Sequence, residues 1–328
     1  MPQINPDDIL NIVRFSELKR QPFKNSFITI GNFDGIHIGH QAIIHRMLQE
    51  AKPKDCPVIV VTLFPNPSDY FTPNIKNQYL STPHEKSVRL FELGVDSVIT
   101  FEFNRKFANL SPTAFISGLI DNLGLGVLVL GPDFALGKDR QGTRSVLEEI
   151  RRKHAFSIET VQPVIYKDQD VSSTKIRQIL DEGNVGGAAK LLGHYYTISG
   201  TVVHGSDRGS KLGLPTANLS SWRRKKKPAV GVYATYVTYN NQVFQGITNV
   251  GYRPTFEVQS LPNVETHILD FDGNIYGEKL TLGFIDKIRN EQKFDSVSAF
   301  LAQIDRDKAV ARKLFYDDET SPNIPLKT

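Results

Sequence analysis

The sequence predicts an α/β protein in two parts: a doubly wound parallel sheet, followed by a small β-domain that ends in a helix. Two observations carry this prediction. Short apolar runs alternate with longer amphipathic segments between residues 26 and 183, and closely spaced strand-like runs without intervening helices follow from residue 197. We place the boundary at residue 190, which gives domains of residues 1–190 and 191–328.

The elements of the first domain have recognisable patterns. Ser111, for example, can cap a helix whose first turn suits Pro112. Alternating strands and helices favour a parallel sheet with helices on both faces, and such sheets bind ligands at the carboxyl ends of their strands. The expected strands are residues 26–30, 57–64, 97–103 and 126–131, and the expected helices are residues 40–51, 84–94, 111–124 and 143–155.

The second domain is expected to be a closed or sandwiched β-domain. Turn signals such as NN at 240–241 and DG at 272–273 separate its strand-like runs, and only residues 296–315 have a helical pattern. The expected strands are residues 197–205, 231–239, 242–251, 264–271 and 278–289.

Composition narrows the function classes. The chain has 39 basic and 35 acidic side chains, a net charge of +4, so we do not expect a nucleic-acid partner on charge alone. Its single cysteine, Cys56, excludes an internal disulfide and a Cys-rich zinc site, and fits a reducing compartment. There is no signal-peptide pattern and no apolar run of about 20 residues. We expect a cytoplasmic protein without a membrane partner; its oligomeric state stays open.

Residues 31–41, GNFDGIHIGHQ, place two histidines directly after a strand. His37 and His40 would point the same way from the first turn of a helix, where free N–H groups already favour an anion. Together they would stabilise the charge that develops during transfer from a nucleoside triphosphate. The alternatives are two ordinary surface or capping histidines, or a zinc site, which the HExxH spacing of metalloproteases and the lack of a third ligand cluster disfavour.

Residues 172–177, SSTKIR, read as a capped helix with basic residues at its start. Ser172 or Ser173 can cap it, while Lys175 and Arg177 supply positive charge for phosphate oxygens. A plain capped helix with basic surface residues is the alternative.

Residues 204–219, HGSDRGSKLGLPTANL, do not fit a Walker P-loop, because Lys211 is followed by Leu212. Their glycines can still bring backbone N–H groups near phosphates. Thr216 and Asn218 would project from one face of an extended segment, and their oxygens suit Mg²⁺ held mainly by phosphates and water.

The basic run RRKKK, residues 223–227, is expected to be a solvated loop beside Trp222, which we expect to be buried under it. Contact of this run with RNA or a membrane surface is the alternative.

The first half resembles the HxGH nucleotidyltransferases, and with Asn32, Phe33 and Asp34 ahead of the histidines it resembles the bacterial bifunctional riboflavin kinase/FAD synthetase family. The segments 62–71 (TLFPNPSDYF), 131–142 (GPDFALGKDRQG) and 172–180 (SSTKIRQIL) follow in the family's order. The resemblance implies that ATP and FMN give FAD and pyrophosphate. It implies catalytic roles for His37, His40 and Arg177, and ligand contacts by Gly31, Asn32, Phe33, Asp34, Gly39, Asn66, Asp133, Phe134, Ser173, Thr174 and Lys175.

Two segments depart from that family. Phe64 and Asn66 stand where it usually has an acidic residue and a histidine, and Ala135–Leu136 interrupt its F-x-F-G loop. Because Asn keeps an acceptor and Leu can still pack a flavin face, we expect altered kinetics more than loss of this activity.

The second half resembles the flavokinase module, with RGSK and LGLPTAN similar to its eukaryotic form. GVYA (231–234), NVGYRPTF (249–256), ETHILDFDGNIYGEKL (265–280) and IRNEQKF (288–294) follow in order. The resemblance implies a six-stranded Greek-key barrel that transfers the γ-phosphate of ATP to riboflavin. It implies that Glu265 is the general base, that Thr216 and Asn218 contact metal and phosphate, that Arg289 lies beside the flavin, and that Gly205, Gly209, Lys211 and Gly213 belong to the nucleotide loop.

The sequence thus predicts a bifunctional enzyme that makes FMN from riboflavin and FAD from FMN, with Mg²⁺ and ATP. Three alternatives stay open: a monofunctional riboflavin kinase with a degenerate first domain, a non-catalytic flavin-binding regulator, and a nucleotidyltransferase for another acceptor. A regulator would not need a base and two phosphate-handling sites, and another acceptor would leave the barrel unexplained.

Overall fold

A computed structural model describes residues 12–71, 78–131, 143–167, 169–205, 214–252 and 262–320. The chain divides into two compact units, Met1–Ser172 and Ser173–Thr328, which are taken in turn.

The first unit is built on a six-stranded sheet in which every pair of neighbours is parallel. From β2 the chain moves outward through β3 and β4, and it then returns to place β5 on the other side of β2, so the strand order reverses between β2 and β5. This confirms the predicted doubly wound sheet. The strands, in spatial order, are β1 (Ile12–Val13), β4 (Ser97–Glu102), β3 (Val58–Phe64), β2 (Ser26–Ile30), β5 (Leu125–Leu130) and β6 (Ser157–Thr160).

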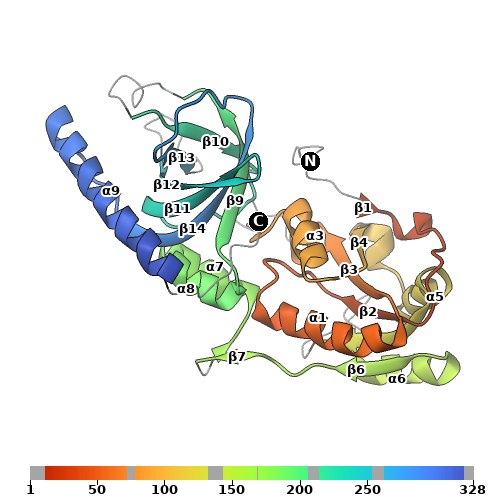
Figure 1. Ribbon diagram of the computed structural model, residues 1–328. Helices are drawn as coiled ribbons and strands as arrows, with labels where there is room; N and C mark the ends of the chain where they lie inside the picture. Colours follow the sequence, from red (N-terminus) through yellow and green to blue (C-terminus); the bar gives the residue numbers. More distant parts are fainter. Residues whose placement is uncertain are drawn as a thin grey trace. The chain divides into compact units, whose positions relative to one another are not determined.

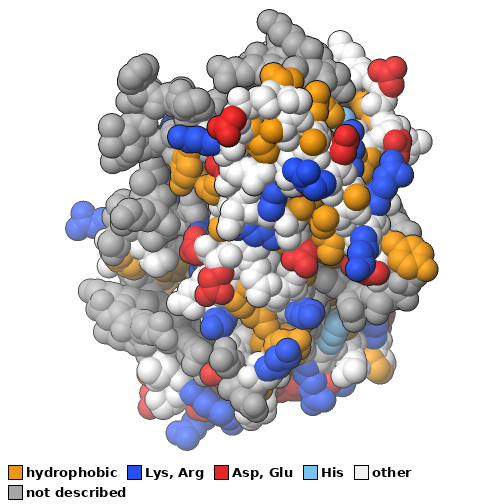
Figure 2. Space-filling model, turned by 90° about the vertical axis from the view of Figure 1, so that its left-hand side faces the viewer, with side chains coloured by type: hydrophobic (Ala, Val, Ile, Leu, Met, Phe, Trp, Pro, Cys, Tyr) orange, Lys and Arg blue, Asp and Glu red, His pale blue; other side chains and the backbone are white. Residues whose placement is uncertain are grey.

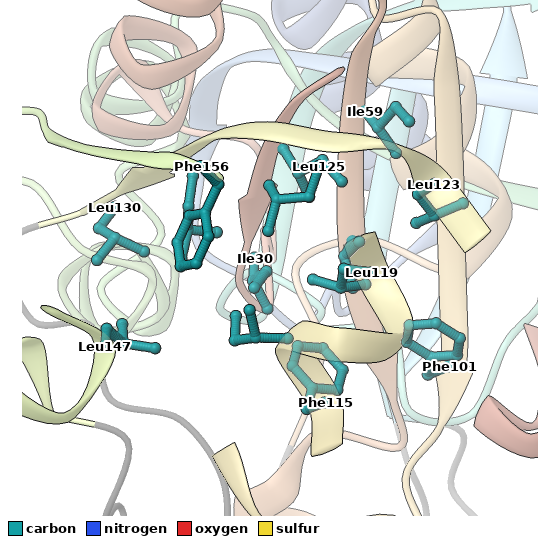
Figure 3. Close-up of a cluster of buried hydrophobic side chains, with 14 of the residues drawn as sticks. Ile30, Ile59, Phe101, Phe115, Leu119, Leu123, Leu125, Leu130, Leu147 and Phe156 are labelled. Atoms are coloured by element: carbon teal, nitrogen blue, oxygen red, sulfur yellow. The ribbon is translucent and has the colours of Figure 1, made fainter. Parts of the chain in front are cut away.

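Helices cover both faces of this sheet (Figure 1). One apolar cluster joins the sheet to α1 (Ile38–Ala51) and α3 (Pro83–Glu92), and a second joins it to α5 (Pro112–Leu123) and α6 (Arg144–Lys153). Figure 3 shows the second cluster, in which side chains of α5 and α6 meet those of the strands. The remaining elements are short: η2 (Phe15–Glu17), η3 (Lys52–Lys54), α2 (Pro67–Phe71), α4 (Arg105–Ala108), β7 (Ile165–Tyr166) and β8 (Gln169–Asp170).

The helix starts follow from local chemistry. Ser111 caps α5, accepting the N–H of Ala114 at 3.1 Å, and Pro112 is the first helical residue, as predicted. Thr82 and Glu85 form a reciprocal capping box at the start of α3. This fixes the entry of α3, the helix that bears on the site described below.

The second unit contains a closed antiparallel barrel of six strands, in the spatial order β10-β13-β12-β11-β14-β9. Strands β11, β12 and β13 are consecutive neighbours, and β14 returns to lie beside β11, which is the Greek-key order that the resemblance implied. The strands are β9 (Tyr196–Val203), β10 (Ala217–Ser221), β11 (Gly231–Tyr239), β12 (Gln242–Gly251), β13 (Asn263–Ile268) and β14 (Lys279–Arg289).

Three helices accompany the barrel. The long α9 (Val297–Thr320) packs along β11, β12 and β14, while α8 (Val185–Leu192) packs on β14, β9 and the preceding α7 (Ser173–Asp181). Both α7 and most of α8 precede residue 190, yet both helices lie in the second compact unit. The boundary between the two functional domains stays a prediction.

The expectation that residues 223–227 are solvated is wrong for Lys225, Lys226 and Lys227, which are all buried, whereas Arg223 is exposed. The ammonium of Lys225 lies over the ring of Tyr196, 5.0 Å from its centroid, and Lys226 pairs with Asp181. An aromatic partner from β9 and an acidic partner from α7 thus offset the cost of burying Lys225 and Lys226.

In the part of the chain that the structure describes, no helix is both long and apolar enough to cross a membrane. On the face drawn in Figure 2, basic and acidic side chains are both spread over the described surface.

Candidate functional site

The loop between β2 and α1 leads into the two histidines, His37 at the N-cap of α1 and His40 in its first turn. It leaves the carboxyl end of β2 beside β5, at the strand-order reversal where open α/β sheets bind ligands. The turn needs left-handed backbone at Phe33 (φ 46°), Gly35 (φ 81°) and Ile36 (φ 42°). The sequence therefore brings its histidines to the ligand-binding edge of the sheet through an unusually tight turn.

His37 and His40 form one unit. Their rings are stacked, with centroids 3.7 Å apart and planes 18° apart. His37 is the N-cap of α1, and its Nδ1 accepts the backbone N–H of His40 at 3.4 Å. Because Nδ1 accepts, the proton of a neutral His37 ring sits on Nε2. A Cβ on Gly39 would lie 3.1 Å from Nδ1 of His37, so glycine at this position avoids a close contact with the ring.

Burial keeps both rings neutral. His37 is 7% exposed, and desolvation lowers its pKa to about 4, against the opposing charge of Asp34. The pKa of His40 is lowered well below its ordinary value by burial, and further by the charges of His37 and Lys86. The pair can therefore donate hydrogen bonds at pH 7 without carrying charge.

Asp34 shapes the turn from inside. It is 2% exposed, and its Oδ1 accepts the N–H groups of Leu80 and Ser81, both at 3.0 Å. The hydroxyl of Ser81 also accepts the N–H of Gly35 at 3.0 Å. Phe33 is buried in the apolar cluster beneath α1. The structure thus gives Asp34 and Phe33 contacts within the protein that support the loop.

The same loop is bound by a lysine that sequence reasoning missed. The Nζ of Lys86, on α3, donates to the carbonyl of Asn32 at 2.5 Å and to the hydroxyl of Thr62 at 3.1 Å. No sequence pattern indicated Lys86, because α3 is distant from the loop in the sequence and contacts it only in the folded protein.

The proline segment after β3 holds the predicted Asn66. Its N–H donates to the hydroxyl of Tyr79 at 3.0 Å, and that hydroxyl also bonds to Asp69. Phe64, in place of the family's acidic residue, is buried against the ring of Tyr79, with centroids 5.9 Å apart. The side-chain oxygen of Asn66 is buried and has no hydrogen-bond partner among the described residues, which leaves an acceptor for a ligand.

The segment that resembles the family's second phosphate motif starts at Ser172, the last residue of the first unit. The carbonyl of Val171, just before Ser172, would lie 3.9 Å from a Cβ on Gly39. The predicted residues Ser173, Thr174, Lys175 and Arg177 follow in the first two turns of α7.

In the barrel, three predicted or neighbouring polar residues share one row. Asn218 on β10 and Asn249 on β12 are both register partners of Glu265 on β13. Asn263, which sequence reasoning missed, donates from Nδ2 to Glu265 Oε1 at 2.7 Å and to Asn218 Oδ1 at 3.1 Å. The Glu265 carboxylate is therefore oriented toward the PTAN strand, on the face of β13 opposite the buried Val264 and Thr266.

Two close approaches complete this row. A Cβ on Gly205 would collide with the Asn218 amide, so glycine is required there. His267, left unassigned from the sequence, hydrogen-bonds through Nδ1 with the carbonyl of Pro215 at 2.9 Å. Thr216 is thus held next to β13 by its neighbour.

Arg289, predicted beside the flavin, is engaged by α9. Its Nε lies 2.9 Å from both oxygens of Asp307, and a further guanidinium nitrogen lies 2.8 Å from Oδ2. Asp307 is fully buried, and Gln303 also donates to it at 2.8 Å. Arg289 therefore ties the end of β14 to α9.

The donors present fit a hard cation. Within the described ranges, no group of three or more His, Cys, Asp or Glu side chains could hold a metal ion. Thr216 and Asn218 offer two neutral oxygens, and an amide oxygen that accepts one bond from Asn263 keeps a second lone pair. Such a set suits Mg²⁺ whose other ligands are phosphates and water.

Five predicted ligand residues, Asp133, Phe134, Gly209, Lys211 and Gly213, lie outside the described residues, as do Ala135 and Leu136.

Two family models match the chain in succession. A model described as FAD synthetase matches residues 19–175, and one described as riboflavin kinase matches residues 192–315. Each match contains one of the two polar clusters described above.

Curated relatives match nearly the whole chain. A bifunctional riboflavin kinase/FMN adenylyltransferase of Pseudomonas fluorescens is 36% identical, over 93% of this chain and 98% of its own length. The Escherichia coli K12 protein of the same name is 37% identical, over 91% of this chain and 95% of its own length.

A crystal structure named for a macrolide-efflux protein of Streptococcus pneumoniae is 32% identical, with a TM-score of 0.83, and the match covers 92% of this chain and 98% of that one. Its name gives an activity that differs from those of the curated relatives, and we take from it the shared fold.

Proposed function

The chain belongs to the family of bifunctional riboflavin kinase/FMN adenylyltransferases, and we propose that it makes FMN from riboflavin and FAD from FMN at two separate sites, with ATP as the second substrate of each. One observation carries the proposal: each family match contains its own set of buried or oriented polar groups. These are the stacked histidines at the strand-order reversal and the hydrogen-bonded side chains of Asn218, Asn263 and Glu265 in the barrel.

For the second reaction, a phosphate oxygen of FMN attacks the α-phosphorus of ATP, and the bond to the β-phosphate breaks to release pyrophosphate. A phosphate monoester is already an anionic nucleophile, so this step needs charge stabilisation rather than a base. His37, with its proton on Nε2, and His40 donate to phosphate oxygens. The family resemblance also assigns Lys175 and Arg177 to this reaction as sources of positive charge. The unpartnered oxygen of Asn66 accepts a hydrogen bond from a substrate.

For the first reaction, the substrate hydroxyl must lose its proton as the γ-phosphate is transferred. Glu265 is the general base, and its bond from Asn263 holds one oxygen so that the other faces the substrate. Thr216 and Asn218 would hold Mg²⁺, which would supply positive charge to offset that of the phosphates.

Two further assignments belong to this proposal. Residues 1–190 and 191–328 are the functional domains, supported by family matches that end at residue 175 and begin at residue 192. The compartment is the cytoplasm, where ATP is available and the lone Cys56 stays reduced.

Reciprocal variants test the division of labour. Glu265→Gln should lower riboflavin phosphorylation at least 100-fold, because the base is lost, while adenylylation of supplied FMN stays within twofold of wild type. Glu278→Gln, a change of the same kind at an exposed residue before β14, is the control. Full kinase turnover in the Glu265 variant would remove Glu265 from the mechanism.

The double variant His37→Asn/His40→Asn should do the reverse, losing FAD formation and keeping FMN formation. His45→Asn, at an exposed position on the same helix, is its control. If the double variant made FAD from FMN at the wild-type rate, the histidines would have no role in adenylyl transfer.

A further inference from the structure

We propose that Lys86 is a positioning residue for adenylyl transfer, which holds the β2–α1 loop through the carbonyl of Asn32 so that the histidines face the nucleotide. This inference rests on the proposed FAD-forming activity of the first domain.

Lys86 ties three elements together. It lies in the first turn of α3 and is 3% exposed. Its Nζ donates to Asn32, in the loop, and to Thr62, on β3, at 2.5 and 3.1 Å. The hydroxyl of Thr62 lies 3.2 Å from the same Asn32 carbonyl. That carbonyl is thus held from the neighbouring strand and from the helix above the sheet, immediately before the strained Phe33.

A buried ammonium is a costly way to fill space. An unbranched apolar side chain such as Met would occupy this site without the penalty of desolvating a charge. Asp34 is the carboxylate whose charge favours the ammonium, and two N–H groups from the α3 side, those of Leu80 and Ser81, already bind it. We therefore attribute the presence of a lysine at this position to its hydrogen bond with the backbone that leads to the histidines.

The charge of Lys86 also reaches the histidines. It is one of the causes that lower the pKa of His40, after burial and the charge of His37. A protonated Lys86 thus helps to keep His40 a neutral donor. Loss of the ammonium would remove its hydrogen bond to the loop and also its contribution to the lowered pKa of His40.

Burial brings this ammonium into an accessible titration range. Desolvation lowers the pKa of Lys86 to about 8, with Asp34 opposing the shift. The titratable groups that face it are Asp34 in the loop and the neutral His40 on α1, while β3 offers the hydroxyl of Thr62. Lys86 is therefore charged below pH 8 and loses its proton above it.

The test compares kcat and KM of both reactions of the full-length protein between pH 6.5 and 9.5. Lys86→Gln should lower kcat/KM for FAD formation from FMN at least tenfold, mainly through kcat, as expected for misplaced donors, with FMN formation within twofold of wild type. Lys86→Arg keeps the charge and should recover part of the loss. Lys153→Gln, at the exposed end of α6, is the matched control and should change neither reaction.

The pH profile separates positioning from mere stability. In the wild type, kcat/KM for FAD formation should fall above pH 8 relative to that for FMN formation, and Lys86→Arg should move this fall to higher pH. A flat wild-type profile up to pH 9.5, or a Lys86→Gln variant within twofold of wild type in FAD formation, would overturn the inference. If the wild type makes no FAD from FMN at any pH, the proposed function of the first domain fails, and this inference fails with it.

Discussion

Single residues in the first unit owe their properties to burial more than to pairing. His37 and His40 are neutral because burial disfavours their charged forms, and the tautomer of His37 follows from one backbone N–H. Both the substrates and the products of this reaction are anions, and the products must be released. Neutral donors stabilise the charge that develops during the reaction, but they bind the products less tightly than a permanently charged side chain would.

This burial makes the first unit sensitive to acid. An unfolded histidine titrates near pH 6.5, whereas His37 in the folded protein titrates near pH 4. Between these values the unfolded state binds more protons, so the free energy of unfolding falls as pH falls, by up to about 1.4 kcal/mol per pH unit for each such histidine. The protection factors of the β2 amides in the wild type, which correct for the intrinsic exchange rate, should fall from pH 7 to pH 5, and His37→Asn/His40→Asn should reduce this fall. Equal behaviour of both proteins would contradict it.

Asn66 separates function from stability. Its buried oxygen has no partner within the described ranges, and an unsatisfied buried group costs about 1–3 kcal/mol. Asn66→Ala should therefore leave the melting temperature of the first unit unchanged or slightly raised, while FAD formation falls at least tenfold. A destabilised variant with normal FAD formation would show that Asn66 acts only in folding.

Some of these residues could be read from the sequence and others could not. The histidines, PTAN and Glu265 were found because their chemistry needs particular residues at fixed spacing. Lys86 and Tyr79 reach their partners only through the packing of separate elements, as Asn263 reaches Asn218, and no local pattern marks these contacts. The burial of residues 225–227 was missed for the same reason: Tyr196 and Asp181 lie far away in the sequence.

At the scale of elements, hydrophobic periodicity was a reliable guide. The buried strand at Ser26–Ile30 and the helix at Pro112–Leu123 lie within a residue of their predicted positions, because their apolar faces and caps are encoded locally. The short edge strands β1 and β6 went unpredicted, since two and four residues carry too little pattern.

A buried ion pair between Arg289 and Asp307 adds to the apolar contacts that hold helix α9 on the barrel. The Arg289 side chain is 17% exposed and that of Asp307 is inaccessible. Removing one charge leaves the other buried, so Asp307→Asn should lower the free energy of unfolding of the second unit by about 3–5 kcal/mol. Because β14 leads into residues 288–294, FMN formation should fall as well.

Urea unfolding, followed by the fluorescence of Trp222 in the second unit, measures this cost. Arg312→Gln on the same helix, whose pair with Asp270 is 63% and 81% exposed, should change stability by less than about 1 kcal/mol. A similar small effect for Asp307→Asn would mean that the Arg289–Asp307 pair contributes little to docking α9.

At the scale of the whole molecule, the chain carries two complete folds, each with its own polar cluster. The family matches and the relatives cover both, which favours two activities over a kinase that keeps an idle first domain. Phe64 and Asn66 are then tolerated departures: one packs on Tyr79, and the other keeps an acceptor.

The most direct test is chromatographic separation of flavins after incubation of the purified protein with ATP and Mg²⁺, started in parallel from riboflavin and from FMN. Two working sites predict FAD from both starting flavins, with FMN as an intermediate in the first. If riboflavin stops at FMN and supplied FMN stays unchanged, the chain is a riboflavin kinase with a degenerate first domain. Binding of flavin without turnover in either reaction would identify a regulator and contradict both activities.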